Sequence, residues 1–150
     1  MAKYNITERK QKEVTYHTMV NPKLMEELRE KIVKIVAIQK KYRDKKFTAR
    51  RLAQELGTNT RYVSAVVNLC FNKNYTSFVN GYRIEEAKQV LLDPAASELT
   101  MEDISDMVGF ANRQSFYASF YRVTGMAPRE YRRKYMEGGK DVNKEEDVRQ

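Results

Sequence analysis

The sequence predicts an all-α protein with about seven helices, built from two helix-turn-helix subdomains joined by a connecting helix. Three observations predict this class: an amphipathic stripe near the N-terminus, two similar segments about 52 positions apart, and a helical pattern between them. The 150 residues, 41% of them apolar, suffice for one compact domain or two very small ones. We expect a flexible basic arm (1–20), a first subdomain with the connecting helix (21–92), a second subdomain (93–136) and a disordered tail (137–150).

The first helix is predicted to begin at Asn21 and Pro22, because asparagine caps helices well and proline suits the first helical position. Apolar residues then recur at steps of four and three, which places them on one helix face. They are Leu24, Leu28, Ile32 and Ile35. Basic residues stand near the expected C-terminal end, where cations are favourable. They are Lys40, Lys41 and Arg43. One long amphipathic helix is therefore expected.

An internal repeat follows this helix. Thr48, Leu52, Leu56 and Gly57 reappear 52 positions on as Thr100, Ile104, Val108 and Gly109. Asn59, Val63 and Val67 reappear 53 positions on as Asn112, Phe116 and Phe120. Each copy predicts a threonine-capped helix, a left-handed glycine, a polar cap and a second helix. One such unit is common in helical bundles, but two copies at matched spacing predict two helix-turn-helix units.

A connecting helix is predicted between the copies. Ser77 is its candidate N-cap, and the helix is expected to run to Leu92 before Pro94. About 15 residues at 1.5 Å each span roughly 22 Å, so this helix is expected to set the separation of the two units. Its apolar side contains Ile84, Ala87, Val90 and Leu91.

A short helix is predicted to close the second unit. Gly125 is expected to stop the preceding helix, and Pro128 to open the last one. Tyr131 and Tyr135 lie one turn apart on it, and this setting favours packing over base stacking.

The charge distribution is the kind that suits a polyanionic partner. The chain has 28 basic and 20 acidic side chains, a net charge of +8. Residues 1–50 hold 14 basic and six acidic side chains, whereas residues 51–150 hold 14 of each. The basic excess fits either phosphate contact or a solvated lysine-rich surface.

Several classes of function are disfavoured. Cys70 is the only cysteine, which allows no intramolecular disulfide or cysteine-rich zinc site and fits a reducing cytoplasm. His17, the only histidine, lacks partner metal ligands, so no metal and no cofactor are expected. No nucleophile and base pair or phosphate-binding glycine loop indicates an enzyme. No membrane-spanning apolar stretch or signal peptide is visible, so a cytoplasmic protein without membrane contact is expected.

The second copy resembles the C-terminal signature of the AraC family of bacterial transcription regulators. The residues that carry this resemblance are Gly109, Phe110, Phe116, Phe120, Gly125, Pro128, Tyr131 and Arg132. It extends backward to cover roughly residues 24–135. The resemblance implies a bipartite DNA-binding domain whose two recognition helices enter successive major-groove segments on one face of double-stranded DNA. It also implies contact with RNA polymerase.

The first copy departs from the family pattern at three positions. Ala65 stands where an arginine is usual, Val67 where an aromatic anchor is usual, and Asn74 where a glycine is usual. Base reading by the first unit is therefore the weaker expectation. Only about 20 residues precede the first helix, which leaves no room for the family's N-terminal sensory domain. The chain is thus expected to be a stand-alone regulator or the DNA-binding part of a larger sensor-regulator.

Candidate DNA-contacting residues follow from subtracting the inward face of each recognition helix. On the first helix they are Thr60, Arg61, Ser64, Ala65 and Asn68, and on the second Arg113, Gln114, Tyr117, Ala118 and Tyr121. Arginine can grip guanine with two hydrogen bonds, glutamine can do so for adenine, and alanine suits a thymine methyl. Each polar side chain equally fits a phosphate contact or a solvated surface. A monomer on DNA is expected, and a protein-interaction module with weak DNA affinity is the rival interpretation.

Overall fold

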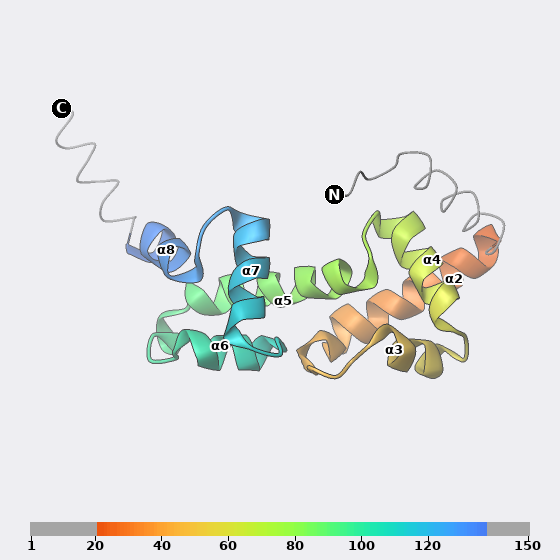
Figure 1. The fold of residues 1–150 in the computed structure, drawn as a ribbon, viewed down its shortest axis with the longest axis horizontal. Helices are drawn as coiled ribbons and strands as arrows, with labels where there is room; N and C mark the ends of the chain where they lie inside the picture. Colours follow the sequence, from red (N-terminus) through yellow and green to blue (C-terminus); the bar gives the residue numbers. More distant parts are fainter. Residues whose placement is uncertain (1–20, 138–150) are drawn as a thin grey trace, which may run out of the picture. The chain divides into compact units, whose positions relative to one another are not determined.

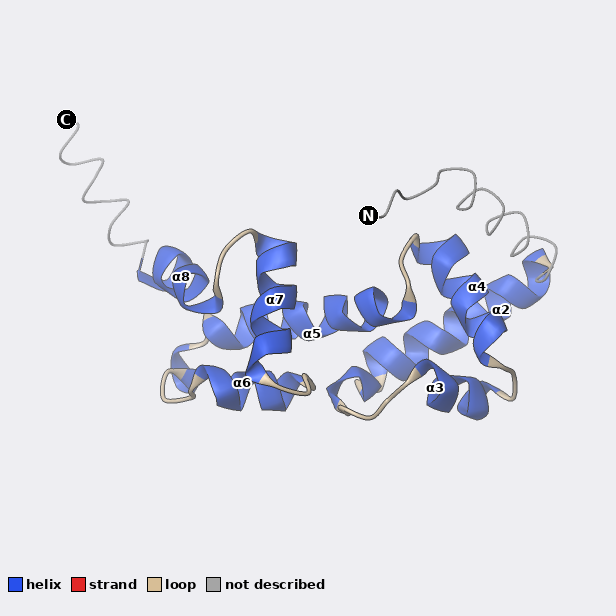
Figure 2. Cartoon of the chain, viewed as in Figure 1, coloured by secondary structure: helices blue, strands red, loops and turns tan. Residues whose placement is uncertain are grey.

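The computed structural model describes residues 21–137, which are largely helical and contain no strand (Figures 1 and 2). Their α-helices are α2 (Pro22–Val33), α3 (Ala49–Leu56), α4 (Thr60–Phe71), α5 (Tyr75–Leu91), α6 (Met101–Val108), α7 (Arg113–Thr124) and α8 (Pro128–Arg132). Short 3-10 or π-helical turns link or extend them, namely η1 (Lys34–Ile38), η2 (Lys41–Arg43), η3 (Pro94–Ala96) and η4 (Arg133–Glu137). The all-α prediction with about seven helices is confirmed. The arm expected over residues 1–20 and the tail expected beyond residue 137 lie outside the described residues.

The described chain divides into two compact units, with the boundary between Val79 and Asn80 inside α5. The first unit contains α2, α3, α4 and the start of α5. The second contains the rest of α5 together with α6, α7 and α8. Each unit therefore holds one copy of the sequence repeat.

Helix α2 begins as the sequence predicts but ends less regularly. Asn21 accepts a 2.8 Å hydrogen bond from the first turn, and Pro22 is the first helical residue. The helix then passes into the π-helical turn η1, and the chain reverses at Lys40, which has a φ of 57°. Val36, four positions after the buried Ile32, is fully buried at this end, whereas Ile35 is half-buried. A spacing of four places Ile32 and Val36 on one side of the helix.

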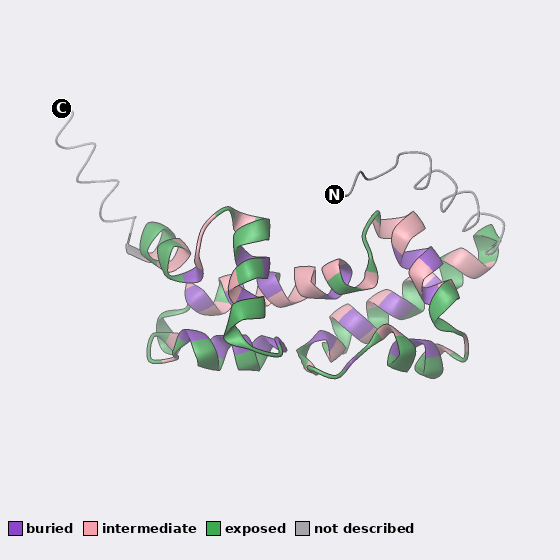
Figure 3. Ribbon diagram, viewed as in Figure 1, coloured by how far each residue is buried: buried purple, intermediate pink, exposed green. Residues whose placement is uncertain are grey.

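The buried residues of the first unit lie on α2, α3, α4 and the start of α5, with others in η1, in η2 and just before α3 (Figure 3). The rings of Phe71 and Phe78 lie 4.6 Å apart and join the end of α4 to α5. The Tyr75 hydroxyl donates a 2.8 Å hydrogen bond to the Phe47 carbonyl, which fixes the segment before α3. The buried residues are Leu28, Ile32, Val36, Tyr42, Phe47, Leu52, Ala53, Val63, Ala65, Val66, Val67, Phe78 and Val79.

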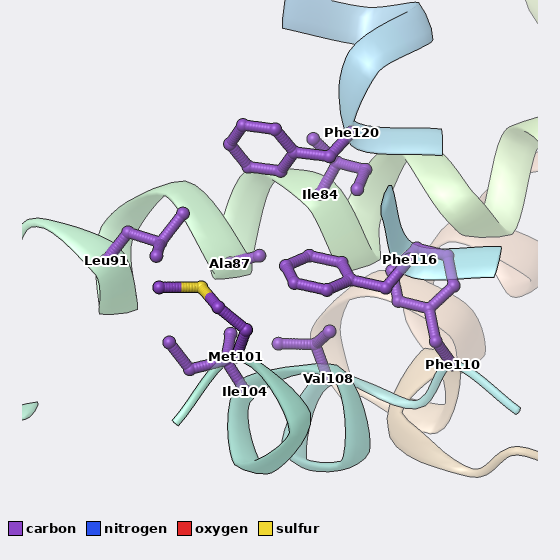
Figure 4. Close-up of a cluster of buried hydrophobic side chains, with 9 residues drawn as sticks. All are labelled: Ile84, Ala87, Leu91, Met101, Ile104, Val108, Phe110, Phe116 and Phe120. Carbon is purple, nitrogen blue, oxygen red and sulfur yellow. The ribbon is translucent and has the colours of Figure 1, made fainter. Parts of the chain in front are cut away.

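The second unit is built around an aromatic cluster (Figure 4). Phe116 lies at its centre, with its ring centroid 5.4 Å from that of Phe110 and 5.7 Å from that of Phe120. Tyr131 of α8 packs edge-on against Phe120 at 5.3 Å, which attaches the last helix to the unit. Burial of each large apolar side chain is worth about 1.5–3 kcal/mol, so this cluster contributes much of the unit's stability. Its other members are Ile84, Ala87, Leu91, Met101, Ile104 and Val108.

Helix α5 begins earlier than the sequence analysis predicted. Its first residue is Tyr75, and the Asn74 side chain accepts a 2.8 Å hydrogen bond from the Ser77 backbone N–H. Ser77 is therefore the third residue of the helix rather than its cap. Asparagine caps helices as well as serine does, so Asn74 is a sound cap that the prediction of Ser77 overlooked. The helix ends at Leu91, one residue before the predicted end.

Candidate nucleic-acid interface

Each unit contains a helix-turn-helix with the capping that the repeat predicts. The Thr48 hydroxyl accepts a hydrogen bond from the first turn of α3 at 3.2 Å, and Thr100 does the same for α6 at 3.0 Å. Asn59 caps α4 at 3.1 Å, and Asn112 caps α7 at 2.8 Å. In the second unit the Asp103 carboxylate also accepts from the Thr100 backbone N–H at 2.9 Å, which completes a capping box. These caps fix where each helix begins.

The turn between the two helices of each unit depends on a left-handed glycine. Gly57 has a φ of 69° and Gly109 a φ of 106°, a region that glycine enters without steric cost. In the second unit the Ser105 hydroxyl also donates a 3.2 Å hydrogen bond to the Asn112 carbonyl. This bond ties α6 to the start of α7. The predicted turn chemistry is therefore present in both copies.

Helix α4 is the candidate recognition helix of the first unit. Thr60 and Arg61, in its first turn, are exposed, whereas Ser64 and Asn68 are half-buried. These four residues share one side of the helix. Ala65 does not join them, because it is fully buried in the core of the unit. A buried methyl group has no surface to offer a thymine methyl, so Ala65 does not fit the groove contact that the sequence analysis predicted for it.

Helix α7 is the candidate recognition helix of the second unit. Arg113, Gln114 and Ala118 are exposed, and Tyr117 is half-buried. The Arg113 guanidinium lies over the Tyr117 ring, with its carbon 5.7 Å from the ring centroid. Tyr117 in turn packs edge-on against Phe116 at 5.8 Å. Arg113 therefore rests on a ring that is itself held by the aromatic cluster.

The two recognition helices present different chemistry at equivalent positions. Their N-caps, Asn59 and Asn112, correspond in the repeat. Arg61 is the second residue of α4, whereas Arg113 is the first residue of α7. The structural counterpart of Arg61 is therefore Gln114. Because arginine suits guanine and glutamine suits adenine, the two units are equipped for different base edges.

Two more side chains continue the exposed face of α7 toward its C-terminal end. Tyr121 is 62% exposed, and Arg122 is exposed as well. Arg122 lies four positions after Ala118 and eight after Gln114, and such residues recur on one side of a helix. Arg122 was not among the residues predicted to contact DNA, although the same spacing rule identifies it.

A metal site, a reactive thiol and a membrane-spanning helix each have requirements that the described residues do not meet. Among residues 21–137, no three His, Cys, Asp or Glu side chains are grouped so that they would hold a metal ion. Burial raises the pKa of the half-buried Cys70 thiol, so the thiol is protonated at neutral pH. Within the same range, no helix combines the length and apolar character that a membrane crossing requires.

The chain matches known transcription regulators in sequence and fold. Residues 52–134 match the AraC-type family described as "Helix-turn-helix domain". The uncharacterized HTH-type transcriptional regulator YobQ of Bacillus subtilis (strain 168) is 31% identical over 87 residues, which are 58% of this chain and 35% of that protein. A second regulator of that bacterium, the uncharacterized HTH-type protein YtdP, is 27% identical over 89 residues, 59% of this chain and 11% of that protein. The chain thus spans about a third or less of the length of these relatives.

A solved structure agrees with the sequence matches. It is the C-terminal domain of the two-component response regulator yesN from Fusobacterium nucleatum, with a TM-score of 0.60 and 26% identity. The similarity covers 69% of this chain and 96% of that domain. Its extent, the family match and the two helix-turn-helix units lead to one conclusion, which the sequence analysis also reached. The chain belongs to the AraC-type helix-turn-helix family of DNA-binding transcription regulators.

Proposed function

We propose that this protein is a sequence-specific transcription regulator that reads double-stranded DNA with α4 and α7, each in its own segment of the major groove. One observation carries the proposal. Each unit holds an asparagine-capped second helix whose inner face is buried and whose first turn exposes an arginine. In a helix-turn-helix, it is the N-terminal part of the second helix that contacts base edges in the major groove.

Each exposed residue has a proposed role. Arg61 and Arg113 each donate two hydrogen bonds to a guanine, and Gln114 pairs with an adenine. Ala118 meets a thymine methyl, and Arg122 extends the same surface. Shorter polar groups along α4 suit phosphate and sugar contacts, which set the register on the duplex. They are Thr60, Ser64 and Asn68, whereas Tyr117 contributes its ring, on which the Arg113 guanidinium rests.

The proposal includes a monomer on one asymmetric site, because one chain carries two different reading helices and needs no symmetric partner. When all of α5 is counted with the first subdomain, the two subdomains are residues 21–92 and 93–136, and the C-terminal part of α5 also packs into the core of the second unit. The regulator would act in the cytoplasm and, as the family resemblance implies, would contact RNA polymerase once it is on DNA.

Selection of sites from a random double-stranded pool by the full chain tests the proposal. We expect one asymmetric sequence with two preferred half-sites about one helical turn, 10–10.5 base pairs, apart. Sedimentation of the complex with the selected duplex should show one chain per site. A palindromic site bound only by a dimer would contradict the monomer, and a folded chain that selects no sequence would favour a protein-interaction module.

A further inference from the structure

We propose that residues 40–51 form a phosphate-binding surface that anchors the first unit to the DNA backbone, and that the second unit lacks a counterpart. This inference rests on the proposed DNA-binding function and assigns its backbone contacts to one part of one unit. The observation behind it is a reversal of charge between two segments that occupy the same place in the repeat.

The repeat pairs residues 40–51 with residues 92–103, which lie 52 positions later. The first segment contains seven basic side chains and one acidic one, whereas the second contains four acidic side chains and no basic one. Each segment leads into the first turn of the first helix of its helix-turn-helix, α3 or α6. The same part of the scaffold is therefore strongly positive in one unit and strongly negative in the other.

The positive segment is fixed to the core, which leaves its charges on the outside. Tyr42 and Phe47 are only 5% and 3% exposed, and the Phe47 carbonyl accepts a 2.8 Å hydrogen bond from a hydroxyl of α5. The Asp44 carboxylate accepts from the Lys46 backbone N–H at 2.9 Å and from the Arg51 guanidinium at 3.3 Å. The single acidic residue of the segment thus serves to fold the turn. The exposed basic residues are Lys40, Arg43, Lys45, Lys46, Arg50 and Arg51.

The position of these charges suits a phosphate. Lys46 and Arg50 flank the start of α3, where unpaired backbone N–H groups and the helix dipole also attract anions. When the second helix of a helix-turn-helix occupies the major groove, the first helix crosses the DNA backbone. With α4 in the groove, Lys46 and Arg50 therefore face phosphates.

The corresponding positions of the second unit are unsuited to that contact. Glu98 and Glu102 stand where the first unit has Lys46 and Arg50, 52 positions earlier. Asp103 adds a third carboxylate and accepts a hydrogen bond from the backbone at the start of α6. Carboxylates repel a phosphate within about a Debye length, roughly 8 Å at physiological salt. Backbone affinity at this place in the scaffold therefore comes from the first unit.

The test measures how affinity depends on salt for two double variants of the full chain. K46Q/R50Q removes two charges from the proposed surface, and K23Q/K31Q removes two charges from exposed positions on α2. Each lost phosphate contact lowers the slope of log affinity against log salt by about 0.9. We expect K46Q/R50Q to lower the slope by about 2, to weaken binding to selected and random duplexes alike, and to keep the parental sequence preference. K23Q/K31Q should keep the parental slope.

Equal slopes for the two double variants, or an altered sequence preference in K46Q/R50Q, would overturn the inference. The swap K46R/R50K keeps both charges and should therefore keep the parental slope. A slope for this swap as low as that of K46Q/R50Q would also contradict the inference. If K46Q/R50Q loses its helical circular dichroism, the single variants K46Q and R50Q carry the test, each lowering the slope by about one. Failure of the unmodified chain to bind any duplex at low salt would instead overturn the proposed function.

Discussion

Tyr117 restricts the position of the Arg113 side chain, which is a candidate base reader. Its guanidinium lies over the Tyr117 ring at 5.7 Å, and that ring is half-buried against Phe116. A cation stacked on a ring face keeps its N–H edges available while its conformational freedom is reduced. We infer that Tyr117 positions Arg113 for a base contact, and that the ring matters more than the hydroxyl.

Two substitutions of Tyr117 separate the ring from the hydroxyl. Tyr117→Phe keeps the ring and should bind the selected site nearly as well as the parent chain. Tyr117→Leu removes the ring and should weaken binding by about two- to fivefold, with the loss confined to the half-site that α7 reads. Anisotropy titrations with duplexes altered in one half-site at a time provide the measurement. Equal losses for both variants would show that the hydroxyl, and not the ring, makes the important contact.

Ala65 shows where a residue-by-residue prediction reaches its limit. The repeat pairs it with Ala118, and helical periodicity assigns both to the outward side. In the structure Ala118 is exposed but Ala65 is buried, and α4 packs against α2 as well as against α3. The periodicity of one helix identifies its most apolar face, but it does not show how many other helices pack against that helix. The exposure of Arg61 and Gln114 was predictable, because a charged or amide side chain in the first turn of a helix stays at the surface whatever packs on the other face.

Helix caps were the most predictable elements. A threonine or asparagine directly before an apolar pattern satisfies backbone N–H groups that the helix leaves unpaired, and Thr48, Asn59, Thr100 and Asn112 all do so. The π-helical turn η1 after α2 was not predictable, because its sequence carries an ordinary helical pattern. The start of α5 was missed because only Ser77 was considered as its cap, whereas Asn74 caps it three residues earlier. Local hydrogen bonds therefore fixed this helix start as well.

The capping box of α6 predicts a pH dependence. Hydrogen bonds from the Thr100 backbone and side chain hold the pKa of Asp103 below its ordinary value of 3.8. A carboxyl whose pKa is lower in the folded state stabilises the fold at pH values above its unfolded-state pKa. This stabilisation is lost as the pH falls through the folded-state pKa. The melting temperature of the parent chain should therefore fall more steeply below pH 3.8 than that of Asp103→Asn. Parallel curves of melting temperature against pH would contradict this role of Asp103.

The aromatic cluster predicts a large difference between two substitutions on α7. Phe116 is fully buried between Phe110 and Phe120, whereas Val123 is 52% exposed. Phe116→Ala should lower the free energy of unfolding by about 3–5 kcal/mol, because it removes a large side chain and leaves a cavity. Val123→Ala should change it by no more than about 0.5 kcal/mol. Urea unfolding followed by circular dichroism compares them, and similar losses would show that α7 does not pack as described.

At the scale of the whole molecule, two copies of one scaffold have diverged in core and surface. Val63 and Val67 anchor the first recognition helix, whereas Phe116 and Phe120 anchor the second. The segments before α3 and α6 carry opposite charges. This divergence suits a chain whose two units make different contacts with one asymmetric site. The scaffold and its duplication were predictable from the spacing of a few glycines, caps and apolar residues, because these residues determine the turn geometry.

The most direct test of the central claim, two recognition helices that read separate half-sites, is the site profile selected by Arg61→Ala and by Arg113→Ala. Each variant should lose about 1–3 kcal/mol of binding free energy and relax its preference in one half-site only, a different half for each. A phosphate contact would instead weaken binding to all sequences equally and lower the salt slope by about one. If both variants select the parental sequence across both halves, these two arginines are not the base readers, and base recognition by the first turns of α4 and α7 is contradicted.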